Sequence, residues 1–253
     1  MSSGCKFSIV TACYNSGTTI AHAISSLKRQ TWSDVEHIVI DGASSDGTQE
    51  IVMSTLSPQD IFVSERDNGI YDALNKGIYH SSGDVIGFLH SDDFLANDSV
   101  LQRVAEFFLV SGADAVYGDL QYVKASDSFQ IVRDWRSGKF SLAKLRRGWM
   151  PPHPTFFMRR EFYERLGVFD TRFRIASDYD SLLRYLSEPS LKVAYLPEVL
   201  VKMRVGGASN GSLKQVFRKS REDFAIMKKN GLNPYIALPY KNLSKLSQLF
   251  MTV

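Results

Sequence analysis

Hydrophobic and polar positions alternate in two ways along the first half of the chain. Short runs of β-branched and apolar residues are typical of buried strands. They are separated by stretches whose apolar residues recur three or four positions apart, which is typical of amphipathic helices. The pattern predicts strands at Phe7–Ala12, Glu36–Asp41, Ile61–Ser64, Asp84–Leu89 and Ala115–Tyr117, and helices at Thr18–Gln30, Thr48–Leu56, Ile70–Tyr79 and Ser99–Ser111. Since strands and helices alternate, we expect an α/β fold with a mostly parallel sheet flanked by helices.

The second half of the chain has a less regular pattern. Prolines at residues 151, 152 and 154 break any helix there. The pattern then predicts a strand at Thr155–Met158 and helices at Arg160–Leu166, Asp178–Leu186 and Ser212–Asn230. The last helix begins a C-terminal helical tail. We therefore divide the chain into a domain of residues 1–210 and a tail of residues 211–253.

The tail differs from the rest of the chain in its charge. From residue 202 to residue 253, ten lysines and arginines stand against two acidic residues, although the net charge of the whole chain is only +3. A basic segment of this kind predicts an anionic partner, which could be a membrane surface, a nucleic acid or an anionic sugar polymer. The alternative is a basic helix that is simply solvated.

The composition is that of a globular protein in a reducing compartment. Apolar residues make up 44% of the chain and charged residues 23%, which is ordinary for a globular domain. Cys5 and Cys13 lack the spacing of a redox or metal motif, so we expect free thiols. Residues 1–6 are too few and too polar for a signal peptide, and no apolar run reaches the length of a spanning helix. We expect a cytoplasmic protein that contacts membranes only peripherally.

Polar residues follow the predicted strands, and in a parallel sheet these strand ends form one edge where ligands bind. Asp41 follows the second strand, and its carboxylate can accept a hydrogen bond from a ring N–H such as the imide of uracil. The alternative for Asp41 alone is a turn or helix-capping role. Arg66 follows the third strand, where its guanidinium can pair with phosphate. Alternatively, that segment only starts the next helix.

Asp92 and Asp93 follow the fourth strand and are the sharpest sign of chemistry. Two adjacent carboxylates repel each other, so the pair is costly without a cation. Mg²⁺ is usually bound by one or two carboxylates together with substrate phosphates, and such an ion would stabilise a departing diphosphate. The alternative is an exposed turn before the next helix. Taken with the other strand ends, the pair favours a metal site.

Asp178 lies at the start of a predicted helix in the second half of the chain. Its carboxylate could be a general base that takes the proton of an attacking sugar hydroxyl. The alternative is helix capping, because carboxylates at a helix start interact favourably with the macrodipole. His153, between two prolines, is weaker evidence for either a ligand or a structural residue.

Five segments, taken together, resemble glycosyltransferase family 2, whose members have the GT-A fold. These segments are Phe7–Asn15, Ile38–Thr48, Ser64–Gly77, Gly87–Asp93 and Ser177–Arg184. The third is similar to a variant found in bacterial surface-polysaccharide enzymes. The resemblance implies a Rossmann-like sheet with a nucleotide-sugar-binding half at residues 1–120 and an acceptor-binding half at residues 121–210.

The resemblance also implies roles for particular residues. The uridine would be held by Thr11, Tyr14 and Asp41, the ribose or metal by Asp92, and the Mn²⁺ or Mg²⁺ ion by Asp93, with Asp178 as the base. The implied reaction is an inverting transfer from a UDP-hexose or UDP-N-acetylhexosamine to a glycan or an undecaprenyl-diphosphate-linked acceptor. The tail would then meet the inner face of the plasma membrane, and no nucleic-acid partner is expected.

Some positions depart from the family pattern. Ala12 stands where the family usually has proline, and Ser177 stands where it commonly has glutamate, so only the aspartate role carries over. The signature and membrane spans of processive members are missing, which argues against a polymerase.

Two other functions compete with glycosyl transfer. A sugar nucleotidyltransferase would need a glycine-rich, cationic loop after the first strand, but residues 15–18 contain one glycine and no cation. A non-catalytic nucleotide- or glycan-binding module would not need Asp92, Asp93 and Asp178.

Overall fold

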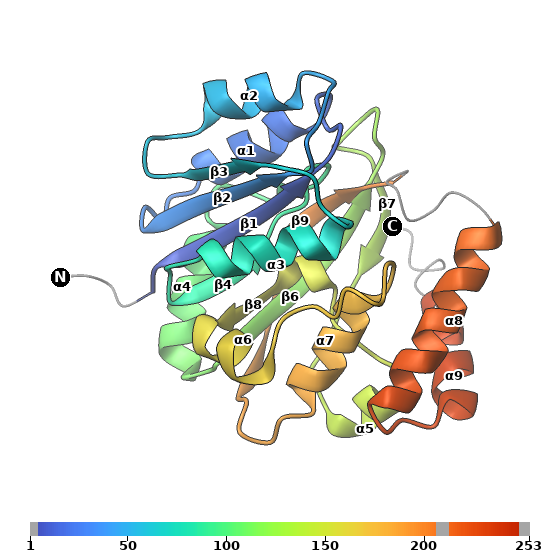
Figure 1. Cartoon of the computed structure of the whole chain (residues 1–253). Coiled ribbons are helices and arrows are strands. Elements are labelled where there is room, and N and C mark those ends of the chain that lie inside the picture. The colour runs from blue at the N-terminus through green and yellow to red at the C-terminus, as the bar shows by residue number, and fades with distance from the viewer. Residues whose placement is uncertain (1–4, 206–212, 248–253) are drawn as a thin grey trace.

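A twisted sheet forms the centre of the protein in a computed structural model that describes residues 5–205 and 213–247 (Figure 1). In this part of the chain the sheet has nine strands in the order β3-β2-β1-β4-β8-β6-β9-β5, and β7 pairs with β6. The strands are β1 (Phe7–Cys13), β2 (Val35–Asp41), β3 (Ile61–Ser64), β4 (Val85–Phe88), β5 (Phe94–Leu95), β6 (Ala115–Val123), β7 (Ile131–Trp135), β8 (Phe156–Arg159) and β9 (Val193–Arg204).

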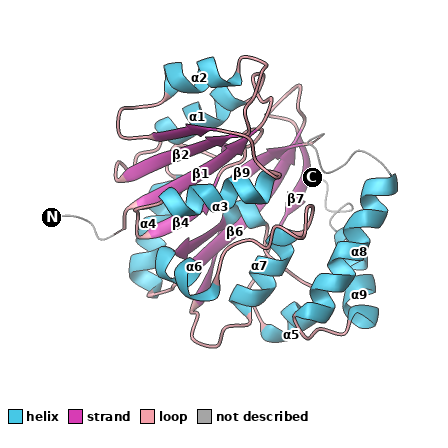
Figure 2. Cartoon of the chain, viewed as in Figure 1, coloured by secondary structure: helices cyan, strands magenta, loops and turns pink. Residues whose placement is uncertain are grey.

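Helices cover both faces of this sheet (Figure 2). They are α1 (Ile20–Lys28), α2 (Thr48–Thr55), α3 (Ile70–His80), α4 (Val100–Ser111), α5 (Leu142–Arg146), α6 (Arg160–Leu166), α7 (Ser177–Leu186), α8 (Leu213–Lys229) and α9 (Pro234–Ser247), with a 3-10 turn at His153–Thr155. Buried residues of α3, α6 and α7 form one hydrophobic cluster with the sheet. Those of α4 and part of α1 form a second cluster, and α1 also packs with α2 over β2.

The strand register confirms the predicted α/β fold with a mostly parallel sheet. β1 lies parallel to β2 and β4, and β2 lies parallel to β3. β8 runs antiparallel between β4 and β6, while β6 and β9 are parallel. The carboxyl ends of β1, β2 and β3 are level, since Cys13 pairs with Asp41 and Asp41 with Ser64. The loops that follow these strands therefore begin along one edge.

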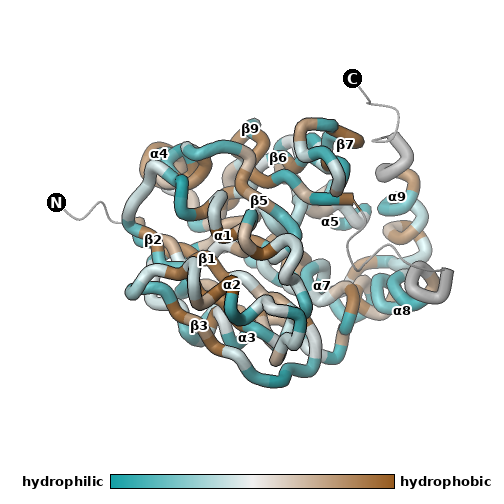
Figure 3. The backbone as a smooth tube through the Cα atoms, turned by 90° about the horizontal axis from the view of Figure 1, so that it is seen from above, coloured by the Kyte–Doolittle hydropathy of each residue, from teal (hydrophilic) through white to brown (hydrophobic). Residues whose placement is uncertain are grey.

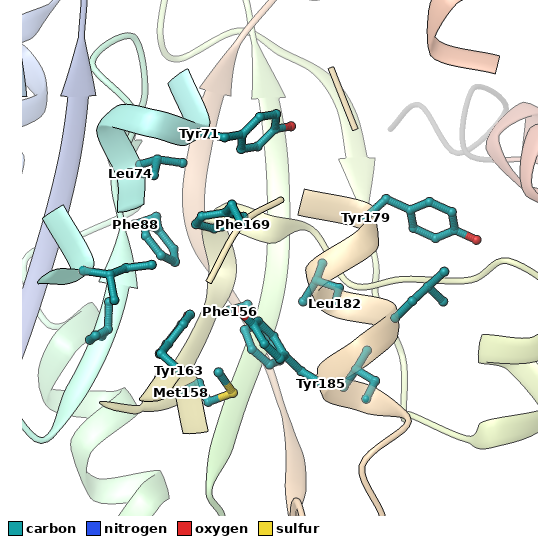
Figure 4. Close-up of a cluster of buried hydrophobic side chains, with 14 of the residues drawn as sticks. Tyr71, Leu74, Phe88, Phe156, Met158, Tyr163, Phe169, Tyr179, Leu182 and Tyr185 are labelled. Atoms are coloured by element: carbon teal, nitrogen blue, oxygen red, sulfur yellow. The ribbon is translucent and has the colours of Figure 1, made fainter. Parts of the chain in front are cut away.

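One glycine lets α3 lie close to this edge. A Cβ on Gly77 would come within 2.1 Å of Val10 Cγ1 on β1, so any side chain there would push the helix away from the sheet. On the same face, the rings of Tyr71, Phe88 and Phe169 lie together between α3 and α7 (Figure 4). This packing fixes the start of α3 relative to the sheet.

The longest strand was not predicted from the sequence. β9 contains Pro197, which cannot donate a hydrogen bond to a neighbouring strand and is unusual within a sheet. The structure places it at a register shift: Tyr117 of β6 pairs with Tyr195, but Asp119 pairs with Val199. Three residues of β9 thus oppose one residue of β6, and the proline lies in this bulge. The short β5, β7 and α5 and the helix α9 were also missed.

The tail helices pack against the core of the preceding domain. Ile226 and Met227 of α8 and Ala237 of α9 are fully buried in the same hydrophobic cluster as Tyr179 of α7. α8 is drawn largely in the colours of hydrophilic residues, whereas hydrophobic and hydrophilic segments alternate along α9 (Figure 3). Ser212, the predicted start of the tail helix, and the predicted boundary at residues 210 and 211 lie outside the described residues.

Two sequence expectations concern the cell compartment. Cys5 and Cys13 are both buried and free, as expected. Within residues 5–205 and 213–247, the structure contains no helix with the length and hydrophobicity required to cross a bilayer.

Candidate active site

Two residues assigned to the nucleotide turn their side chains into the protein. Thr11 of β1 is fully buried, and its hydroxyl lies 2.9 Å from His37 Nε2. Asp41, at the end of β2, is also fully buried. Its carboxylate accepts hydrogen bonds from the Ser44 N–H at 3.0 Å, from the Ser44 hydroxyl and from the Ser64 hydroxyl at 2.7 Å. Both side chains therefore organise the strand ends from within.

Tyr14 and Arg66, the other two residues assigned to the nucleotide, lie on the surface. Tyr14 follows β1 and is 65% exposed, so its ring is open to a ligand. Arg66 follows β3 and is exposed, and its carbonyl accepts a hydrogen bond from Lys76 Nζ at 3.2 Å. Since β1 and β3 end level with each other on either side of β2, both residues are next to the same edge of the sheet.

Asp93, after β4, is a buried carboxylate without a partner. It is 1% exposed, and no residue that the structure describes donates a hydrogen bond to either of its oxygens. Burial raises the pKa of Asp93 well above its usual range, and the charge of Asp92 raises it further. The nearby backbone N–H of Arg204, which does not meet the geometry of a hydrogen bond, and the charge of Arg204 oppose the shift. A buried carboxylate normally finds a donor, so this one is suited to an ion or ligand.

These carboxylates fit a divalent cation that also binds its substrate. In the described part of the chain, no group of three or more His, Cys, Asp or Glu side chains is arranged to hold a metal ion. Mg²⁺ needs only one or two protein carboxylates, because phosphate oxygens and water complete its shell. The unpartnered oxygens of Asp93 and the adjacent half-buried Asp92 meet that requirement.

Arg204, at the end of β9, adds a positive charge beside Asp92 and Asp93. Its guanidinium donates a hydrogen bond to the Asp92 carbonyl and contacts His22 Nδ1, and it lies 5.0 Å from the ring centre of Phe94. In the sequence, this arginine is only one of the basic residues between residues 202 and 253. Its place at the end of a strand that was not predicted explains why its position was missed.

Asp178, in the first turn of α7, is held in a fixed orientation. Its Oδ1 accepts a hydrogen bond from its neighbour, the Tyr179 N–H, at 2.8 Å. The Tyr71 hydroxyl of α3 lies 3.1 Å from the same oxygen and 3.0 Å from the Ile175 carbonyl. Burial raises the pKa of Tyr71 well above its usual range, so this hydroxyl stays a donor. Among the described residues, no hydrogen bond reaches Oδ2, which leaves that oxygen for a substrate.

Asp93 and Asp178 both influence the pKa of neighbouring side chains. Burial raises the pKa of Tyr122, Arg133 opposes this, and the negative charges of both Asp93 and Asp178 raise it further. Burial lowers the pKa of His90, and both Asp92 and Asp178 oppose that shift. Carboxylates from separate halves of the chain thus act on the same two side chains, Tyr122 and His90.

His153 is a buried, stacked ring beside β4. Its ring centre is 4.8 Å from that of Phe88 in a stacked arrangement and 6.0 Å from that of His90. Burial lowers the pKa of His153 to about 4, with Asp178 opposing and His90 adding to the shift. The ring is therefore uncharged at neutral pH. The turn that carries it packs against both β4 and α7.

The loop before Asp178 is anchored from two helices. Asn75 of α3 pairs with the backbone of Phe169 through both its amide oxygen and its amide nitrogen, each at 2.9 Å. Glu222 of α8 accepts hydrogen bonds from three successive N–H groups, at Arg174 (3.3 Å), Ile175 (2.8 Å) and Ala176 (3.1 Å). Roles for Tyr71, Asn75 and Glu222 were not predicted from the sequence, because their partners are far away in the chain.

Known proteins with related sequences fall into one family. A family model described as glycosyl transferase family 2 matches residues 8–174. The PGL/p-HBAD biosynthesis glycosyltransferase of Mycobacterium bovis is 32% identical over 218 residues, which make up 84% of this chain and 82% of the relative.

Solved structures share the fold at lower sequence identity. S. aureus TarS 1–349 in complex with UDP-GlcNAc superposes with a TM-score of 0.66 at 18% identity, covering 93% of this chain and 70% of that one. The mannosyltransferase PcManGT of Pyrobaculum calidifontis, in complex with GDP-Man and Mn²⁺, gives a TM-score of 0.64 at 19% identity, with coverages of 98% and 76%. At these identities the likeness shows a common GT-A fold.

Proposed function

This chain belongs to glycosyltransferase family 2, and we propose that it catalyses metal-dependent, inverting transfer of a sugar from a UDP-sugar to a hydroxyl group. It is a nucleotide-sugar glycosyltransferase of glycan biosynthesis. The proposal adds the metal ion, the stereochemistry, the uridine nucleotide and the roles of single residues. One observation carries it: the buried, unpartnered carboxylate of Asp93 and the oriented carboxylate of Asp178 are connected by packed rings, which run from His90 through His153 and Phe169 to Tyr71.

The donor side of the proposed reaction is at the strand ends. Asp92 and Asp93 would hold Mn²⁺ or Mg²⁺, which, when bound, supplies charge stabilisation to the diphosphate. The solved neighbours that bind UDP-GlcNAc, or GDP-Man with Mn²⁺, support a nucleotide sugar and a divalent ion. Arg204 contributes a fixed positive charge on the same side. The exposed ring of Tyr14 and the side chain of Arg66 are beside the same edge, where the nucleotide would lie.

The acceptor side of the proposed reaction is at α7. A sugar hydroxyl is a weak nucleophile at neutral pH and needs a positioned base. Oδ2 of Asp178 would take the hydroxyl proton while the hydroxyl oxygen attacks the anomeric carbon. The bond from that carbon to the diphosphate oxygen breaks, and the nucleoside diphosphate leaves with the electron pair. Attack opposite the leaving group inverts the configuration in one step.

The experiment that tests this function is a panel of nucleotide sugars with Mn²⁺ or Mg²⁺. Release of nucleoside diphosphate is measured for the wild type and for Asp93→Ala. We expect turnover with a UDP-sugar that stops on addition of EDTA, and a fall of about 100-fold or more for the variant. NMR of the product should show the inverted anomer. Metal-independent turnover, or a retained anomeric configuration, would contradict the proposal.

We further propose that the acceptor is a glycan or lipid-linked glycan of bacterial polysaccharide synthesis, presented at a membrane. The tail helices carry exposed apolar side chains at Phe217, Tyr235, Ile236 and Leu243, beside the exposed basic residues Arg218, Arg221 and Lys228. Apolar and basic residues on one helical segment are suited to an anionic lipid surface.

Point variants test this membrane contact better than truncation, because α8 also contributes core residues and holds the loop before Asp178. Phe217→Ser combined with Tyr235→Ser should reduce sedimentation with anionic vesicles about tenfold and leave donor turnover unchanged. Equal sedimentation with anionic and neutral vesicles would contradict an electrostatic contact.

A further inference from the structure

We infer that Asp67, rather than Asp41, is the carboxylate that recognises the edge of the donor's nucleobase; this inference rests on the proposed nucleotide-sugar function. Both residues are at the edge formed by β1, β2 and β3. They differ in whether their oxygens are available to a ligand, and that difference carries the inference.

The carboxylate of Asp41 is fully occupied within the protein. It accepts hydrogen bonds from the Ser44 N–H, the Ser44 hydroxyl and the Ser64 hydroxyl, and the Cys13 thiol lies 3.6 Å from Oδ1. A carboxylate has about four acceptor positions, so these four donors leave none for a nucleobase. The side chain is also fully buried.

Asp67 reaches the same edge from the loop between β3 and α3. Its Oδ1 accepts a hydrogen bond from the Gly69 N–H at 2.8 Å, which orients the carboxylate. Among the described residues, no hydrogen bond reaches its Oδ2. The side chain is half-buried, so this oxygen is partly shielded from water and still open to a ligand.

Gly42, directly after Asp41, makes room for this carboxylate. A Cβ on Gly42 would lie 2.7 Å from Asp67 Oδ2 and 3.3 Å from Cδ2 of Tyr14. At the first distance, a side chain at position 42 would push the Asp67 carboxylate aside. The space above the end of β2 is therefore filled from the β3 loop, by a carboxylate oxygen beside an aromatic ring that is 65% exposed.

An open carboxylate oxygen next to an exposed ring suits one class of base. The ring offers a face for stacking, and the carboxylate accepts a hydrogen bond. Uracil carries an N–H at position 3, and guanine carries N–H donors on the corresponding edge. Cytosine has an acceptor nitrogen there, which a carboxylate repels. Asp67 would thus select nucleotides whose base presents an N–H donor, and reject cytidine nucleotides.

Titration calorimetry on the full chain tests this selection. UDP, GDP and CDP are titrated with Mn²⁺ into the wild type, Asp67→Asn, Gly42→Ala and a matched control, Asp72→Asn. Asp72 is a nearby acid whose carboxylate accepts a hydrogen bond from the Asn68 N–H at 2.9 Å and so serves the loop itself. The measured quantity is the ratio of the CDP dissociation constant to that of the better of UDP and GDP.

We expect the wild type and Asp72→Asn to prefer UDP or GDP over CDP by tenfold or more. In Asp67→Asn this ratio should fall about tenfold, because an amide can turn its NH₂ group toward cytosine. Gly42→Ala should lower the ratio as well, since its Cβ displaces the carboxylate without removing the charge.

A folded Asp67→Asn protein that keeps the wild-type ratio would overturn the assignment of Asp67 and leave the proposed function intact. A wild type that binds none of the three nucleotides would overturn the proposed function, and the inference with it.

Discussion

The loop after β4 and the start of α7 carry the two carboxylates of the proposed reaction. These carboxylates differ in their burial and in their hydrogen bonds. Asp93 is buried with no donor to either oxygen. Asp178 is half-buried, with one oxygen held by the Tyr179 N–H and the Tyr71 hydroxyl. An unpaired buried charge costs free energy until an ion binds. A hydrogen-bonded carboxylate is already oriented for its task. In the proposed reaction, the same residue type would therefore serve as an ion ligand at one end and as a base at the other.

The largest loss of activity is expected from a substitution of Asp178. Asp178→Asn keeps the shape and removes the base, so kcat should fall about 10²- to 10⁴-fold. The dissociation constant of UDP with Mn²⁺ should stay within about twofold of the wild type, since the donor contacts lie elsewhere. Initial-rate kinetics and calorimetry measure the two quantities. A variant that loses UDP binding in parallel with turnover would show that Asp178 belongs to the donor site.

Asp93→Asn should reduce turnover about 100-fold and also stabilise the metal-free protein. The raised pKa of Asp93 means that the fold favours its neutral form. The contribution of neutral Asp93 to the free energy of unfolding is therefore fully present below the unfolded-state pKa, near 3.8. This contribution is lost as the pH rises through the raised folded-state pKa. The variant does not titrate, so its advantage should grow from zero at acid pH to about 1–3 kcal/mol at neutral pH.

Denaturant unfolding in EDTA at several pH values measures this difference. Asp92→Asn is the matched control, because Asp92 is half-buried and should change stability less. A metal-free Asp93→Asn protein that is less stable than the wild type at neutral pH would contradict the description of Asp93 as an unpaired carboxylate.

Glu222 affects Asp178 indirectly, because it anchors the loop before Asp178 through three backbone N–H groups. Glu222→Ala should lower kcat about 10- to 100-fold through misplacement of Asp178, with UDP affinity unchanged. Glu222→Gln keeps one acceptor oxygen and should recover part of the loss. Glu164→Ala, which removes a surface pair with Arg160, is the control. A change in UDP affinity without a change in kcat would exclude the positioning role.

The smallest effect is expected at Tyr71. Tyr71→Phe removes one hydroxyl that lies within hydrogen-bond distance of Asp178 and the Ile175 carbonyl. The loss of about 1 kcal/mol of orientation should lower kcat about fivefold. Tyr79→Phe on the same helix removes a hydroxyl from a side chain that is 87% exposed, and it should have no effect. Equal kcat values for both variants would show that the Tyr71 hydroxyl does not orient Asp178.

The strand ends proposed to bind the donor were largely predictable, because they follow from the local pattern of apolar and polar residues. Each strand of the first half is a short apolar run, and the residues after it must lie along one edge of a parallel sheet. Asp92 and Asp93 were therefore placed correctly at the end of a buried strand. Local pattern could not show which carboxylates keep free oxygens. Asp41 and Asp67 both follow strands, and only the packed structure separates the occupied one from the open one.

The environment of Asp178 was not predictable, because its partners come from distant parts of the chain. Tyr71 lies in α3, more than 100 residues before Asp178 in the chain. Glu222 was counted as a minor acidic residue in a basic tail. β9, which ends with Arg204 beside Asp92, contains a proline that opposes strand formation. In each case a tertiary contact decides the role, and no sequence spacing encodes it.

The central claim is that an ion at Asp93 and a base at Asp178 act in one active site. An anomalous difference map from crystals grown with Mn²⁺ and UDP tests it most directly. We predict a strong peak beside the Asp93 carboxylate, in contact with the diphosphate and on the side of the bound nucleotide that faces Asp178. A peak on another surface, or UDP bound with no ion beside Asp93, would contradict the account.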